Sequence, residues 1–80
     1  MMRIEINLYA SLAPYAPAGE GRGPRFLDVE PGVTIREILK SLGVPLDSVK
    51  MVFLNGVHGT VDEVPKEGDR VGVFPPVAGG

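Results

Sequence analysis

Hydrophobic and polar residues alternate in two stretches of the first half of the chain. In residues 3–9, RIEINLY, every second side chain is apolar, and residues 25–30, RFLDVE, repeat the pattern. A period of two places alternate side chains on opposite faces of an extended chain, as in a strand with one buried face. The pattern therefore predicts two strands.

The hydrophobic spacing becomes helical in the middle of the chain. Thr34 and Glu37 have the spacing of a capping box, and Gly43 suits the left-handed conformation that ends a helix. Between them, apolar side chains recur every three or four residues: Ile35, Ile38, Leu39 and Leu42. Such a stripe covers one side of a helix only. We predict a helix over residues 34–42 that packs one face on a sheet and exposes the other.

Two further strands and a hairpin follow the helix. Residues 51–54, MVFL, form a continuous apolar run, as expected of a strand inside a sheet. Asn55 and Gly56 behind it are a strong signal for a tight hairpin turn, so residues 57–58 begin the return strand. Residues 70–74, RVGVF, alternate again and predict the last strand.

The order of these elements predicts an α+β fold in which one helix covers one face of a mixed sheet of four to five strands. This arrangement matches the β-grasp architecture of ubiquitin, in which the first and last strands pair in parallel at the centre. The prediction is a single domain over residues 1–74, followed by an extended tail over residues 75–80. Residues 10–24 hold three prolines and three glycines, and we expect a flexible loop there.

Composition excludes several classes of function. The chain has 80 residues, no cysteine and a formal net charge of -2, and its eight basic residues are scattered. Disulfides, thiolate metal sites and a cysteine nucleophile are therefore excluded, and the charge pattern is unlike that of a nucleic-acid binder. The first ten residues do not read as a signal peptide, and no segment has the ~20 apolar residues of a membrane span. We expect a cytoplasmic protein without a metal site or a bound cofactor.

The last residues carry the candidate chemistry. The predicted site comprises Phe74, Pro75, Pro76, Val77, Ala78, Gly79 and Gly80. The two prolines favour an extended start, and the two glycines allow the terminal carboxylate to pass through a channel only as wide as a backbone. The carboxylate is ionised at neutral pH and is a poor acyl donor until it is activated. No P-loop is present in the sequence, so the activating site is expected on a partner.

The FPPVAGG ending, preceded by EGDRVGV and with VFLNG upstream, resembles the MoaD/ThiS family of ubiquitin-like sulfur carriers. It is most similar to the small subunit of molybdopterin synthase, and the resemblance covers residues 3–9 and 25–80. Many family members have a short helix where this chain has the proline-rich residues 10–24. The resemblance therefore leaves open which partner contacts that segment makes.

The resemblance implies a co-substrate that is not catalytic alone. A ubiquitin-activating-type (MoeB-like) enzyme would use ATP to adenylate the carboxylate of Gly80, and sulfur transfer would convert it to a thiocarboxylate. A MoaE-like large subunit, in a heterotetramer, would then pass the sulfur to cyclic pyranopterin monophosphate in molybdenum or tungsten cofactor biosynthesis. Gly79 would give access to the active site.

Three alternatives remain open from the sequence: a ThiS-like carrier of the thiamine pathway, a ubiquitin-like protein modifier, and a non-catalytic β-grasp binding module.

Other candidate sites have weaker support in the sequence than the C-terminal tail. His58 has no second metal-type ligand nearby, and the adjacent Asp62 and Glu63 point apart in a strand or turn. The glycines of residues 19–23 precede a proline and no helix, which does not favour a phosphate-binding loop. Docking is expected on the sheet face near the tail.

Overall fold

The computed structural model describes residues 1–17 and 25–76. Within them lie five strands, one α-helix and two 3-10 helices. In chain order these are β1 (Met2–Leu8), η1 (Ala10–Tyr15), β2 (Arg25–Val29), α1 (Ile35–Ser41), η2 (Leu46–Ser48), β3 (Met51–Leu54), β4 (Val57–Gly59) and β5 (Arg70–Phe74). Every strand and the α-helix predicted from the pattern is present, with bounds within two residues of the prediction.

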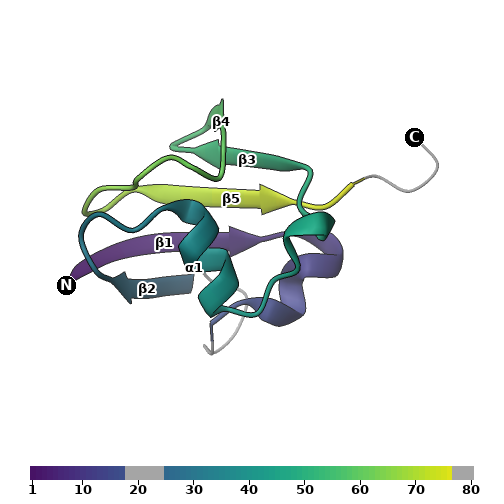
Figure 1. Cartoon of the computed structure of the whole chain (residues 1–80), viewed down its shortest axis with the longest axis horizontal. Coiled ribbons are helices and arrows are strands. Elements are labelled where there is room, and N and C mark those ends of the chain that lie inside the picture. The colour runs from purple at the N-terminus through teal and green to yellow at the C-terminus, as the bar shows by residue number, and fades with distance from the viewer. Residues whose placement is uncertain (18–24, 77–80) are drawn as a thin grey trace.

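The strands form one mixed sheet in the order β2-β1-β5-β3-β4. The first and last strands, β1 and β5, run parallel at its centre, with Ile6 opposite Val71 and Leu8 opposite Val73. The other neighbouring strands are antiparallel. Figure 1 shows α1 lying across one face of this sheet. The topology confirms the predicted β-grasp fold.

The core lies between α1 and the covered face of the sheet. Its fully buried members include Ile4 and Ile6 of β1, Val71 and Val73 of β5, and the helix residues Ile35 and Leu39. All of them are aliphatic and occupy the positions that the alternating and helical patterns assign to the inside. Because a chain of this size has a small core, each of these side chains contributes a large share of its stability.

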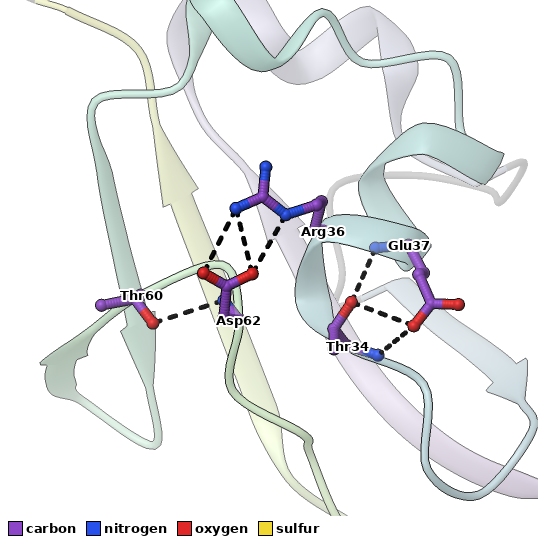
Figure 2. A network of polar contacts seen from close by, with 5 residues as sticks. All are labelled: Thr34, Arg36, Glu37, Thr60 and Asp62. Atoms are coloured by element: carbon purple, nitrogen blue, oxygen red, sulfur yellow. Dashed lines mark hydrogen bonds and ion pairs between the residues drawn. The ribbon is translucent and has the colours of Figure 1, made fainter.

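The start of α1 is held by a polar clamp that Figure 2 shows. The Glu37 amide donates to Thr34 Oγ1 and the Thr34 amide donates to Glu37 Oε1, each at 3.1 Å, which confirms the predicted capping box. Arg36 donates from Nε and Nη2 to the two carboxylate oxygens of Asp62, at 3.0 and 3.2 Å. The Arg36 amide also donates to the Val61 carbonyl at 2.7 Å. The loop after β4 therefore supplies acceptors that the first turn of a helix lacks.

The hairpin between β3 and β4 turns at Asn55 and Gly56, whose φ angles are 53° and 82°. Positive φ at both central residues is the geometry of a type I′ turn, which the Asn-Gly pair predicts. β3 lies inside the sheet between β5 and β4, as expected. It is buried on one face only, with Val52 inside and Met51 exposed, because the helix covers just one side of the sheet.

The expectation of a loop without regular structure over residues 10–24 is corrected in its first part. Residues Ala10–Tyr15 form the 3-10 helix η1, with Pro14 inside it. Proline excludes a long α-helix, but a short 3-10 segment needs few donors, and here the Leu12 amide donates to the Tyr9 carbonyl at 3.0 Å. The Leu12 side chain is 1% exposed and anchors η1 to the core. Residues 18–24 of the predicted loop lie outside the described residues.

Candidate functional site

The tail begins at the end of the central strand β5 and is fixed there on both sides. The Tyr9 amide donates to the Val73 carbonyl at 3.1 Å, and the Lys50 amide donates to the Phe74 carbonyl at 2.8 Å. These bonds extend the pairing of β5 with β1 and β3 up to its last residue. Figure 1 shows the chain leaving the sheet at this end, beside η1. The base of the tail is therefore part of the sheet.

Aromatic side chains gather on the open face of the sheet around this point. The rings of Tyr9 and Phe74 are stacked, with centroids 4.3 Å apart and planes 7° from parallel. Phe53 meets Phe74 edge-on at 5.7 Å, and His58 tilts against Phe53 at 5.6 Å. We call Tyr9, Phe53, His58 and Phe74 the aromatic face. They come from three neighbouring strands, β5, β3 and β4, and from the residue that follows β1.

Gly72 leaves open space beside these rings at the centre of the sheet. It sits between Arg70 and Phe74 on the open side of β5, where any other residue would project a side chain. A Cβ there would lie 3.5 Å from Tyr9 Cε2 and 4.0 Å from Phe53 Cβ. The rings instead border a hollow of about 260 Å³ whose lining includes Gly72, Asn7 and Arg70.

A second, larger hollow lies at the start of the tail. Its volume is about 600 Å³, and its walls include Met51, Phe53, Phe74, Pro75 and Pro76. Ala10 and Ser11, at the beginning of η1, form another part of the wall. We call it the tail hollow. It is shaped mostly by apolar groups, and exposed apolar surface of this kind is typical of sites that bind other proteins.

Unpaired positive charges border these hollows. Lys50 lines the tail hollow and Arg70 the smaller one, and both residues are exposed. Neither side chain has a hydrogen bond or ion pair within residues 1–17 and 25–76; the two salt bridges there join Arg3 to Asp28 and Arg36 to Asp62. An apolar centre with free cations at its edge is complementary to a partner with an apolar patch and acidic groups around it.

A polar network holds the Asn55 turn against the beginning of β5. Asn55 Nδ2 donates to Asp69 Oδ1 at 3.0 Å, and Asn55 Oδ1 accepts from the Arg70 amide at 2.8 Å. The Lys66 amide donates to the other Asp69 oxygen at 2.8 Å. The hydrogen bond from Asn55, followed by that from the Lys66 amide, lowers the pKa of Asp69 below its ordinary value of 3.8. The network fixes the hairpin that carries Phe53 and His58.

The structure describes only part of the site predicted from the sequence. Phe74, Pro75 and Pro76 are described and lie together at the end of β5. Val77, Ala78, Gly79 and Gly80 lie outside the described residues.

The sequence did not identify Tyr9 and His58 as members of the aromatic face at the base of the tail. Tyr9 ends the first alternating stretch, on the side opposite the apolar positions. Only the parallel pairing of β1 with β5 brings it beside Phe74.

In the part of the chain that the structure describes, no three His, Asp or Glu side chains gather in a way that could hold a metal ion. No helix there is long and apolar enough to cross a membrane.

The β-grasp fold, with a tail that starts from the central strand, defines a ubiquitin-like protein. The chain belongs to the Mut7-C ubiquitin family, whose model matches residues 1–79. A comparison with curated protein sequences finds no match.

Solved structures of similar fold come from several organisms. A Pyrococcus furiosus protein assigned as subunit 1 of molybdopterin converting factor is 23% identical, with a TM-score of 0.69 over 96% of this chain and 100% of that one. Small archaeal modifier protein 1 of Haloferax volcanii is 26% identical, with a TM-score of 0.70 over 96% and 100%. A complex of subunits 1 and 2 of molybdopterin-converting factor from Helicobacter pylori contains a chain that is 22% identical, with a TM-score of 0.60 over 99% and 100%. These matches confirm the predicted resemblance in fold to MoaD/ThiS-type proteins.

Proposed function

We propose that this chain is a ubiquitin-like sulfur carrier, and specifically the small subunit of a molybdopterin synthase. In this proposal the carboxylate of Gly80 is adenylated and thiocarboxylated by partner enzymes and then donates its sulfur to cyclic pyranopterin monophosphate. The observation that carries the proposal is the junction at Phe74. The tail leaves the central strand at Phe74, within the aromatic face, and a docked partner would receive it there.

The chemistry follows from the state of the C-terminus. A free C-terminal carboxylate, whose ordinary pKa is about 3.5, is ionised at neutral pH and does not accept nucleophiles. Its oxygen would attack the α-phosphate of ATP in the partner's site, releasing pyrophosphate and forming an acyl adenylate. Sulfide would then attack the carbonyl carbon and displace AMP, which leaves the thiocarboxylate. This account requires that Gly80 carries the free carboxylate in the mature protein. Gly79, which has no side chain, would let the end of the tail enter a narrow channel.

Two partners are proposed to use the same surface in turn. The first is a MoeB-like adenylating enzyme, which binds the ATP. The second is a MoaE-like large subunit, which holds the pterin. The Helicobacter pylori complex of subunits 1 and 2 supports a two-subunit assembly for a protein of this fold. The exposed Lys50 and Arg70 side chains favour partners whose docking patch has acidic groups at its edge.

A protein modifier is the second candidate function. Its support is the match to a small archaeal modifier protein at 26% identity. A modifier would use the same adenylated tail, but a lysine amine would displace AMP to give an isopeptide bond. A thiamine-pathway carrier shares every step up to the thiocarboxylate and differs only in the acceptor.

The test is intact mass spectrometry after incubation with the adenylating enzyme of the same genome, ATP and a sulfide source. We expect a mass gain equal to the replacement of one oxygen by sulfur, localised to Gly80 by fragmentation. A chain that lacks Gly80 should fold and remain unmodified, whereas Phe26→Ala, a change at the far edge of the sheet, should be modified like the wild type.

The acceptor separates the candidates. Addition of the large subunit and cyclic pyranopterin monophosphate should consume the thiocarboxylate and form molybdopterin. Isopeptide-linked conjugates in cell extract, without molybdopterin formation, would favour the modifier. An unmodified wild-type chain in the presence of an enzyme that adenylates its own known substrate would contradict both.

A further inference from the structure

Tyr9 contacts the base of the tail through both its backbone and its ring. Its amide donates to the Val73 carbonyl at 3.1 Å, and its ring lies flat on Phe74 at 4.3 Å. The residue is 42% exposed and does not belong to the buried core. Its ring therefore contacts the last strand residue before the prolines and takes no part in the packing under the helix.

The residues that follow Tyr9 hold it in this position beside Phe74. Ala10 has a φ angle of 51°, in the left-handed region that residues other than glycine rarely adopt. This conformation turns the chain out of line with β1 directly after Tyr9 and starts η1. The Leu12 amide then donates back to the Tyr9 carbonyl at 3.0 Å, and the Leu12 side chain is buried in the core. Thus η1 anchors Tyr9 at the end of β1.

The orientation of Phe74 determines the direction of the tail. Pro75 and Pro76 have restricted φ angles, so a rotation at Phe74 is carried outward by a stiff segment and is not absorbed within it. On the other side of Phe74, its carbonyl accepts from the Lys50 amide at 2.8 Å. Tyr9, which follows β1, and Lys50, which precedes β3, therefore contact Phe74 from its two sides.

We propose that Tyr9 is a positioning residue for the tail, which sets the direction in which Pro75 and Pro76 leave the sheet by stacking on Phe74. This inference rests on the proposed function, in which the end of the tail must reach a partner's active site. A preset direction reduces the conformations that the docked tail has to search before its carboxylate meets ATP. The ring, and not the hydroxyl, carries this role, because the stack needs only the aromatic plane.

The first test measures the tail base without any partner. Hydrogen exchange followed by NMR reports the Lys50 amide, whose acceptor is the Phe74 carbonyl. Tyr9→Ala should accelerate its exchange about tenfold while amides between β1 and β2 keep their rates, and Tyr9→Phe should restore protection. Phe26→Ala, which removes a 55% exposed ring from the same face of the sheet, is the matched control. Unchanged Lys50 exchange in Tyr9→Ala would overturn the proposal.

The second test is the steady-state rate of adenylation with the partner enzyme. A misdirected tail lowers kcat, and we expect a loss of about tenfold for Tyr9→Ala with recovery in Tyr9→Phe. His58→Ala should instead raise KM, because His58 belongs to the aromatic face and its ring packs on Phe53 and not on Phe74. A change in KM alone for Tyr9→Ala would mean that Tyr9 only contacts the partner, and would overturn the positioning role. If the wild-type chain is not adenylated at all, the proposed function fails, while the exchange result still decides whether Tyr9 holds the tail base.

Discussion

The two faces of the sheet are made from the same strands but differ in chemistry. In β5, Val71 and Val73 point under the helix and are completely buried, whereas Gly72 and Phe74 lie on the open side. The covered face is aliphatic and closely packed. The open face at this end of the sheet has rings, two hollows and free cations. Alternation along one strand thus places the aliphatic core on one face and, in the proposed function, the docking surface on the other.

This difference predicts that the proposed docking surface can be changed with little effect on folding. Aliphatic side chains fill the core because their stabilisation depends on buried area and on the absence of voids. Aromatic rings offer a large contact area even when they are half exposed, which suits the proposed docking surface. Substitutions on the two faces should therefore separate the free energy of unfolding from partner affinity.

The largest effect on stability is expected in the core. Ile6→Ala removes a fully buried side chain at the centre of the sheet and should lower the free energy of unfolding by about 2–5 kcal/mol. Urea denaturation followed by circular dichroism measures this loss. The open-face variant Phe26→Ala should change it far less, and equal losses for the two variants would contradict the division between the faces.

Phe53→Ala should have the opposite effect to Ile6→Ala: a large loss of partner affinity and a small loss of stability. It removes the ring that joins Phe74 to His58, and we expect a loss of about 2 kcal/mol in binding to the adenylating enzyme, or roughly 30-fold in Kd. Isothermal titration calorimetry measures the affinity, and denaturation of the same variant should show a smaller loss than Ile6→Ala. Wild-type affinity in a folded variant would exclude the aromatic face as the docking surface.

The clamp at the start of α1 should affect stability alone. Thr34→Ala removes the capping hydrogen bond from the Glu37 amide and should cost about 1 kcal/mol in the free energy of unfolding. Because the clamp lies on the helix side of the sheet and not on the open face, partner affinity should stay at the wild-type value. Thr34→Ser keeps the hydroxyl and serves as the control. A loss of affinity in Thr34→Ala would show that the helix side takes part in docking.

The smallest expected effect is a pH dependence through Asp69. Its pKa is lowered in the folded chain, so its ionised form stabilises the fold above the unfolded value of 3.8, and this contribution is lost as the pH falls through the folded pKa. The contribution should be less than about 1 kcal/mol because the carboxylate is partly exposed to water.

In denaturation curves between pH 7 and pH 2, Asp69→Asn should therefore lose less stability on acidification than the wild type. Asp47→Asn, which removes the same charge from an exposed position, is the control and should follow the wild type. If stability fell equally with pH in Asp69→Asn and in the wild type, the stabilising role of ionised Asp69 would be contradicted.

The sequence predicted the covered face better than the open one for a physical reason. Burial imposes a period on the sequence, so Ile6, Val71 and Leu39 could be assigned to the core from spacing alone. The capping box and the Asn55 turn are local signals and were also predicted correctly.

The elements that were missed depend on contacts between distant residues. In η1 a single buried side chain, Leu12, replaces a periodic pattern, so the proline content suggested a loop. Tyr9 and Phe74 are 65 positions apart in the sequence, and only the parallel register of β1 and β5 brings their rings together. For the glycines of the tail, the sequence remains the source of the functional prediction.

The most direct test of the division between the two faces is an NMR map of the partner contact. The ¹⁵N-labelled chain is titrated with the adenylating enzyme, and the loss of amide signal is followed for each residue. The account predicts early signal loss at Tyr9, Phe53, Gly72 and Phe74, with α1 and the Phe26 edge of the sheet unaffected. Signal loss centred on α1 or on β2, with the aromatic face unchanged, would contradict it.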